Sequence, residues 1–409
     1  MIPETNRRYA FEGIKIVDFA WVGVGPITSK YIADHGATVI RIESHTRPDV
    51  LRLAPPWRDG QPGLDRSQFF ASMNTSKYGV TLDLSKPAAQ ELAKKLIAWT
   101  DIAVESFTPK AMRNWGLEYE QLRQVNPKLI MLSTCQQGQT GPHALYPGFG
   151  QLMASLSGYY HISGWPDRDP APPYGAYTDF IAPRFAATVL MAALDYRRRT
   201  GVGQYIDLAQ YEASLHFLSP ALLDYHVNSR VLGREGNRSF RAAPHGAYRC
   251  KGEDRWLALS VSNDAQWQGL LRALSNPSWG ADSRFVTQTD RLMHCEELDR
   301  LVEAWTVQQK AEAAADSLQQ AGVPAGVVQT CLDLHQDLRL EAWGMFQYLE
   351  HKEMGPSPYE GHQFHLSKTP GELRWAAPVM GQHNEFVFKE ILGLSDAEIA
   401  TLSEEKVLW

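Results

Sequence analysis

The chain has 409 residues, and its 40 Lys and Arg residues are outnumbered by 46 Asp and Glu residues, which gives a net charge of −6. Apolar residues make up 44% and charged residues 21%, a composition typical of a globular enzyme long enough for two domains. Because no basic excess is present to neutralise phosphates, nucleic acid is not expected as a partner.

Short apolar runs alternate with longer helical patterns through the first half of the chain. Helices are predicted at residues 27–35 and 86–99, the second with Pro87 in its first turn, where proline is favoured. Strands are predicted at residues 14–19, 38–42, 102–104 and 129–132. Strands that alternate with helices form a parallel sheet covered by helices, so this half is predicted to be α/β and Rossmann-like.

The second half of the chain changes character near residue 225. The predicted elements are, in order, a helix at 180–199, a strand at 205–208, a helix from Gln210, a polar linker at 226–245, a strand at 256–261, helices at 265–275 and 289–321, and final helices from Glu385 and near Asp396. Residues 246–325 therefore read as a smaller α+β unit. From 326 to about 384 the chain is rich in Pro and Gly.

Targeting and redox signals indicate a cytoplasmic protein. No apolar run reaches the ~18 residues of a membrane span, and residues 1–8 contain no apolar signal-peptide segment. The four cysteines are Cys135, Cys250, Cys295 and Cys331. They lie far apart without metal-ligand spacing, so we expect reduced thiols and no bound metal.

Asp179 is the residue whose position most suggests chemistry. It ends a stretch rich in Gly and Tyr, residues 174–179, and precedes the apolar run 185–194. This places a carboxylate at the start of a helix, beside small residues that leave room for a ligand. Asp is also a favoured helix N-cap, so a purely structural role is the simpler alternative at this position.

Two other kinds of site find weaker support. Residues 23–26, Gly-Val-Gly-Pro, follow the first strand and Glu43 ends the second, which imitates a dinucleotide fingerprint. Thr28 stands where the third glycine belongs and Pro26 lacks an N–H, so a tight turn is favoured over an NAD site. A serine-hydrolase triad is not predicted, because the G-x-S-x-G elbow is missing.

The order of short motifs along the chain resembles that of the family III CoA-transferases. The matching segments are 13–19 with 25–26, 33–43, 74–77 with 82–84, 104–107, 138–142, Asp179, 199–204, 322–324 and 381–385. Each segment is short, but the ordered set covers nearly the whole chain.

The resemblance implies a fold and an assembly. It implies a Rossmann-like large domain whose parallel sheet is built from N- and C-terminal segments, residues 1–225 and 326–409. A smaller α+β domain would span residues 226–325. Two such chains would interlock, either as a homodimer or as a heterodimer with a paralogous subunit.

The resemblance also implies a covalent mechanism. Asp179 would attack the thioester of an acyl-CoA donor, form an acyl anhydride, and then carry CoA as an aspartyl thioester to a carboxylic acid acceptor. CoA would be a substrate, and no permanently bound cofactor is implied.

By position, the family's CoA contacts fall on Gly23, Val24, Leu82, Ser106, Phe107, Thr108, Arg113, Gly148, Phe149 and Gly150. Lys77 and Arg41 are further candidates for the CoA phosphates, and the core is the alternative place for Leu82 and Phe107. The chain departs from the family at Gly23 and Gly150, where other members carry larger side chains. These glycines predict room for a bulky acceptor.

The acceptor is predicted from residues 20–26, which look most like the catalytic subunits of the branch that moves CoA from succinyl-CoA to (R)-2-benzylsuccinate in anaerobic toluene degradation. Intramolecular transfer, or another dicarboxylate such as mesaconate or itaconate, is an alternative. Racemases of this fold pair a His with the Asp, but Phe149 stands at the His position and cannot take a proton. A non-catalytic CoA-binding partner subunit is the remaining alternative, and Asp179 argues against it.

Overall fold

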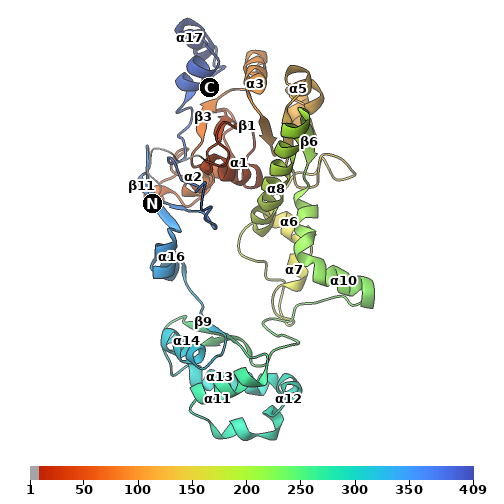
Figure 1. Cartoon of the computed structure of the whole chain (residues 1–409), viewed down its shortest axis with the longest axis vertical. Helices are drawn as coiled ribbons and strands as arrows, with labels where there is room; N and C mark the ends of the chain where they lie inside the picture. The colour runs from red at the N-terminus through yellow and green to blue at the C-terminus, as the bar shows by residue number, and fades with distance from the viewer. Residues whose placement is uncertain (1–8) are drawn as a thin grey trace. The chain divides into compact units, whose positions relative to one another are not determined.

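The computed structural model describes residues 9–409, so residues 1–8, where no signal peptide is predicted, lie outside it. The chain forms two compact units, and Figure 1 labels many of their helices and strands. The first unit contains the chain up to Tyr160 together with Pro172–Leu232 and Arg339–Trp409, and the second contains His161–Ala171 and Gly233–Leu338. No helix within residues 9–409 is both long and apolar enough to cross a membrane.

A six-stranded parallel sheet forms the centre of the first unit. Its strands are β1 (Lys15–Asp18), β2 (Thr38–Glu43), β3 (Tyr78–Thr81), β4 (Ile102–Glu105), β5 (Ile130–Ser133) and β6 (Gln204–Asp207), in the order β3-β2-β1-β4-β5-β6. The α/β class predicted for this half is confirmed. The strand order reverses at β1, and ligands of such sheets bind at this switch point, outside the carboxyl ends of the strands.

Helices cover both faces of this sheet because alternate strand residues point to opposite sides. On one face, Ile16 packs with residues of α1 (Val24–Asp34) and α8 (Tyr177–Thr200). On the other, Val17 packs with residues of α3 (Pro87–Trp99) and α5 (Tyr119–Val125). The first unit also contains α2 (Gln68–Ser72), α4 (Pro109–Asn114), α6 (Gly150–Leu156), α9 (Gln210–Leu215) and α10 (Ser219–Asn228), and the short helix α7 (Tyr159–Ile162) lies at the boundary where the chain passes into the second unit.

The C-terminal segment adds no strand to the parallel sheet within the described residues, so the prediction that it helps to build the sheet is wrong. All six strands lie within residues 15–207. The turn near residue 383 instead covers the outer edge of β3 with side chains: His383 Nδ1 accepts the Gly79 N–H at 3.0 Å, and Asn384 Oδ1 accepts the Thr81 N–H at 2.8 Å. Because these groups already occupy the edge, a seventh strand has no place there.

The C-terminal segment still belongs to the core of the first unit. Val387 and Phe388, in the π-helix η7 (Phe386–Ile391), pack in the same apolar cluster as α3 and α5. The segment also contains α16 (Leu338–Trp343), the antiparallel hairpin β10 (Phe346–His351) and β11 (Gly355–Glu360), and α17 (Asp396–Glu404).

The second unit is a small α+β structure. Its antiparallel sheet consists of β7 (His245–Arg249), β8 (Trp256–Ser260) and β9 (Ala325–Val327), and it packs with α11 (Asp264–Ala273), α13 (Cys295–Thr306) and α14 (Ala311–Gln320). The unit also contains α12 (Gln288–Met293), before α13, and α15 (Cys331–His335), after the sheet. The single helix predicted for 289–321 is wrong. The chain breaks at His294 and again after Thr306, which gives three helices in its place.

Candidate active site

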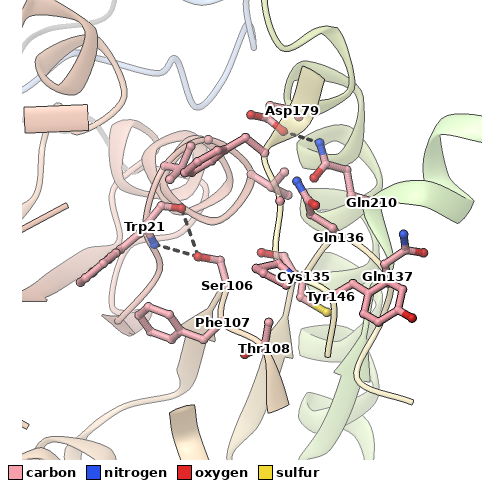
Figure 2. Close-up of a pocket in the computed structure, with 18 of the residues that line it drawn as sticks. Trp21, Ser106, Phe107, Thr108, Cys135, Gln136, Gln137, Tyr146, Asp179 and Gln210 are labelled. Carbon is pink, nitrogen blue, oxygen red and sulfur yellow. Dashed lines mark hydrogen bonds between the residues drawn. The ribbon is translucent and has the colours of Figure 1, made fainter. Parts of the chain in front are cut away.

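A cavity of about 520 Å³ opens at the carboxyl ends of β1, β4 and β5, at the switch point of the sheet. Its walls come from the loops that follow these strands, from residues 144–150, and from the first turns of α1, α8 and α9. Figure 2 shows the side chains that line it. Asp179 is the only charged residue among the described residues that form the lining.

Asp179 lies in the first turn of α8 and is only 7% exposed. The N-cap of this helix is Ala176, and no side chain caps it. The N-cap role considered for Asp179 is therefore wrong. A carboxylate at a helix start that does not cap the helix is available for another purpose.

Two glycines flank the Asp179 carboxylate closely. A Cβ atom placed on Gly23 would lie 2.9 Å from Asp179 Cβ and 3.1 Å from its Oδ2. A Cβ on Gly150 would collide with Asp179 Oδ1. The small residues at 23 and 150 thus allow two backbone segments to contact the carboxylate. This corrects the interpretation that they enlarge the site for a bulky acceptor.

The Asp179 carboxylate has one hydrogen-bond donor among the described side chains, the Gln210 amide, whose Nε2 binds Oδ1. None of the cationic side chains within residues 9–409 forms an ion pair with it. Burial raises the pKa of Asp179 to about 6, and the hydrogen bond from Gln210 lowers it only in part. A carboxylate of this kind is poorly stabilised as an anion, and is ionised at neutral pH without being solvated, which suits a nucleophile.

Buried groups hold the loop that follows β1 in place. Val22 has a φ of +65°, a strained value for a β-branched residue, and its N–H donates to the Asp49 carboxylate at 3.1 Å. Two hydrogen bonds join Trp21 to the loop after β4: Ser106 Oγ accepts the Trp21 backbone N–H at 2.8 Å and donates to the Trp21 carbonyl at 3.1 Å. The loop therefore presents Gly23 to Asp179 in a fixed conformation.

The cations proposed for the CoA phosphates lie elsewhere. Lys77 and Arg41 are fully buried, and both form ion pairs with Asp18, at 3.0 and 3.8 Å. Neither is free to bind a phosphate. Arg113 is exposed, pairs with Glu118 at 2.8 Å, and lines neither of the two cavities described here.

A second cavity of about 460 Å³ adjoins the first, and Trp21, Phe107 and Ala111 line both. It lies at the carboxyl ends of β2 and β3, and it also contains Leu82. Arg47 lines it, is exposed, and forms no ion pair with any residue between 9 and 409. The two cavities therefore lie side by side at the carboxyl ends of neighbouring strands and share part of their walls.

The structure brings most of the predicted site residues together. Gly23, Val24, Ser106, Phe107, Thr108, Gly148, Phe149 and Gly150 line the first cavity with Asp179, while Leu82 lines the second and Arg113 lies apart. Sequence reasoning missed Gln210, Gln136 and Gln137. Gln210 lies two residues after the predicted strand 205–208, and a polar residue at the carboxyl end of a parallel strand is a signal that could have identified it.

A helix-covered parallel sheet with a buried, unpaired carboxylate at its switch point defines an α/β enzyme. Residues 11–384 match the family model described as CoA-transferase family III, and the chain belongs to this family. It is a CoA-transferase by this membership, as the motif order predicts.

Several curated relatives are similar over almost their whole length. The chain is 31% identical to the succinyl-CoA--D-citramalate CoA-transferase of Chloroflexus aurantiacus over 97% of this chain and 98% of that one. It is 30% identical to the succinyl-CoA--L-malate CoA-transferase beta subunit of the same organism, over 99% of each chain. The crystal structure of a CAIB/BAIF family protein from Brucella suis shares the fold, with a TM-score of 0.86 and 27% identity over 94% of this chain and 100% of that one.

Proposed function

We propose that this enzyme transfers CoA from succinyl-CoA to a dicarboxylic acid, with Asp179 as the covalent carrier. The observation that carries the proposal is the buried Asp179 carboxylate, held between two glycines at the switch point of the sheet and paired with no cation of the part of the chain that the structure describes. The donor follows from the relatives, which are named for succinyl-CoA.

The reaction needs four acyl transfers. An oxygen of Asp179 attacks the succinyl-CoA carbonyl, the C–S bond breaks, and a mixed anhydride and the CoA thiolate result. The thiolate attacks the aspartyl carbonyl and releases succinate, which leaves an aspartyl-CoA thioester. The acceptor carboxylate then displaces CoA to form a second anhydride. Finally, the thiolate attacks the acceptor carbonyl, which yields the new thioester and free Asp179.

Backbone N–H groups at the start of α1 suit the developing negative charge. Gly23 is the N-cap of this helix, and no side chain caps it. The first N–H groups of a helix have no intrahelical partner and carry partial positive charge. Since Gly23 contacts Asp179 directly, an oxyanion formed on the donor or acceptor carbonyl would lie within their reach.

CoA is proposed to lie along both cavities, with its thioester at Asp179 and its nucleotide in the second cavity. The contacts proposed are Gly23, Val24, Leu82, Ser106, Phe107, Thr108, Gly148, Phe149 and Gly150, all of which line these cavities. Arg47, with no ion pair to any described residue, takes the phosphate role first considered for Arg41, Lys77 and Arg113.

The acceptor is proposed to be a dicarboxylate with a four- or five-carbon chain, with or without substituents on it, as the relatives named for D-citramalate and L-malate suggest. The amides of Gln136 and Gln137, which line the first cavity, would bind its second carboxylate in place of a cation. (R)-2-Benzylsuccinate is itself a substituted succinate, and it stays within the proposal as one acceptor to be tested.

A second chain is proposed to complete the assembly. Helix α10 buries none of its ten residues, and Leu222, Leu223, Tyr225 and Val227 are exposed on it. Such an apolar surface is typical of an interface. The partner would be a second copy or a paralogue, since the similar L-malate enzyme is named by alpha and beta subunits.

The test is to incubate the purified protein with succinyl-CoA and a panel of acids: the dicarboxylates citramalate, malate, glutarate, mesaconate, itaconate and benzylsuccinate, and the monocarboxylates acetate and butyrate for comparison. New CoA thioesters are identified by mass spectrometry. We expect one or more dicarboxylyl-CoA products, and a loss of at least about 10³-fold in rate on Asp179→Ala. Full activity of Asp179→Ala would refute the mechanism, and products from monocarboxylates alone would refute the acceptor class.

A further inference from the structure

We propose that Gln210 is a catalytic residue of the transfer: its side-chain amide fixes one oxygen of Asp179 and stabilises the negative charge that develops on this oxygen whenever CoA enters or leaves the aspartyl group. The inference rests on the proposed role of Asp179 as carrier. It assigns a specific task to an amide that no motif of the sequence marks.

The Gln210 side chain is held rigidly. It is only 3% exposed, and its Nε2 donates both to Asp179 Oδ1 and, at 2.8 Å, to the Thr178 hydroxyl. Thr178 in turn donates to the Gly150 carbonyl at 3.0 Å. The backbone N–H of Gln210 binds the Cys135 carbonyl at 3.0 Å. Both ends of the residue are thus fixed, and the amide needs no rearrangement to act on Asp179.

The two oxygens of Asp179 have different surroundings. Oδ1 faces Gln210 and the backbone at Gly150, where even a Cβ atom would collide with it. Oδ2 faces Gly23 at the start of α1. Figure 2 shows Gln210 beside the carboxylate, joined to it by the hydrogen bond. Oδ2, the oxygen toward Gly23, is therefore the one that attacks the donor carbonyl. Oδ1, the oxygen toward Gln210, remains the carbonyl oxygen of the aspartyl group.

This arrangement matters most after the anhydride has formed. When the CoA thiolate attacks the aspartyl Cγ, the π electron pair of the carbonyl moves onto Oδ1, next to the amide donor. Collapse of this tetrahedral intermediate breaks the Cγ–Oδ2 bond and expels succinate. The acceptor carboxylate passes through an equivalent intermediate when it displaces CoA from the aspartyl thioester. A positioned donor at such an oxyanion contributes about 10²- to 10³-fold in rate.

The same hydrogen bond acts on the free enzyme. Burial raises the pKa of Asp179, and the amide lowers it, because a donor favours the ionised form. Removal of the amide should therefore leave two signatures: slower chemistry at Cγ, and ionisation of the carboxylate at a higher pH. A residue that only supports the fold would produce neither.

The experiment uses Gln210→Met, which keeps the length of the side chain and removes the donor. The protein is mixed with succinyl-CoA alone and quenched with acid, and the aspartyl-CoA adduct on the peptide that contains Asp179 is followed by mass spectrometry. We expect adduct formation about 100-fold slower than in the wild type. The acid limb of the pH–rate profile should move to higher pH, while the affinity for CoA remains unchanged. Equal rates and an unshifted limb would overturn the proposal.

Ser214→Ala provides the matched control. Ser214 is buried on the same helix, and its hydroxyl binds the Gln210 backbone carbonyl at 2.7 Å instead of the carboxylate. It should leave the acid limb where it is. If Gln210→Met fails to fold, Gln210→Glu of equal size should also move the limb to higher pH, and an unshifted limb would count against the proposal. Absence of an adduct in the wild type would refute the carrier role of Asp179 itself. This outcome is distinct from a failure of the role proposed for Gln210, in which the wild type forms the adduct and Gln210→Met forms it equally fast.

Discussion

Two buried carboxylates of the first unit, Asp179 and Glu43, have opposite environments. They are 7% and 4% exposed. Glu43 accepts two hydrogen bonds from Arg52, at 2.8 and 2.9 Å, and lies 3.2 Å from Arg41. Among the described side chains, Asp179 has only the neutral Gln210 amide as a hydrogen-bond donor. Burial would raise the pKa of both, but the two arginines bring that of Glu43 down to about 2, whereas that of Asp179 is raised to about 6.

The comparison shows how one fold uses the same group in two ways. A buried carboxylate that is fully paired contributes to structure, because its charge is neutralised and both oxygens are bound. A buried carboxylate without a cation costs stability and keeps an oxygen free to react. The substitutions below separate these two roles, from the largest expected effect to the smallest.

Glu43→Gln should strongly destabilise the fold. It leaves Arg41 and Arg52 with one buried negative partner fewer, and breaking a buried ion pair costs about 3 to 5 kcal/mol in the free energy of unfolding. Because the pKa of Glu43 is lowered in the folded state, its stabilisation is present above pH 4.5 and is lost as the pH falls toward about 2. Denaturant unfolding at pH 7 and pH 4 measures this. A loss of stability that did not shrink at the lower pH would contradict the account.

Asp179→Asn should do the opposite and stabilise the fold at neutral pH while it abolishes transfer. The raised pKa means that ionisation of Asp179 costs stability, so its penalty is absent below the ordinary pKa of 3.8 and complete above about 6. At about 1.4 kcal/mol per pKa unit, the gain should be about 1 to 3 kcal/mol at pH 8 and close to zero at pH 4. Thermal melts at the two pH values test it, and a destabilised Asp179→Asn variant at pH 8 would count against an unpaired carboxylate.

Arg47→Ala should weaken binding of the CoA thioester and leave the chemistry intact. Loss of one exposed phosphate contact is expected to raise KM for succinyl-CoA by about tenfold, with kcat unchanged and the effect diminished at high salt. Arg113→Ala is the control, because Arg113 is paired with Glu118 outside both cavities. Steady-state kinetics of the two variants measure KM for succinyl-CoA. A larger increase in KM for Arg113→Ala than for Arg47→Ala would contradict the assignment of Arg47 to the CoA phosphates.

The sequence predicted the part of the fold that depends on local pattern. The strands at 14–19, 38–42, 102–104, 129–132 and 205–208 and the helix at 180–199 follow from apolar runs and periodicity, and all are present in the structure. Strand β3 (Tyr78–Thr81) was not predicted. The C-terminal segment was not predictable in this way, because its place depends on side chains of His383 and Asn384 that bind the distant edge of β3.

The candidate site, like the fold, was predictable only where it depends on local sequence pattern. Asp179 could be singled out by its place between a Gly-rich turn and an apolar helix. Lys77 and Arg41 could not be told from surface cations, since burial of a charge depends on partners such as Asp18 that are distant in sequence. The place of Gln210 after a parallel strand marks it only as a candidate, because its role depends on the packing of α9 beside α8, which brings its amide to Asp179.

The most direct test of the account is to find the covalent carrier. The wild-type enzyme is incubated with succinyl-CoA, quenched in acid and mapped by peptide mass spectrometry, then challenged with an acceptor before the quench. The account predicts a CoA thioester on Asp179 that is discharged by the acceptor at the rate of turnover. A CoA adduct on another residue, or turnover of Asp179→Ala at the wild-type rate, would contradict it.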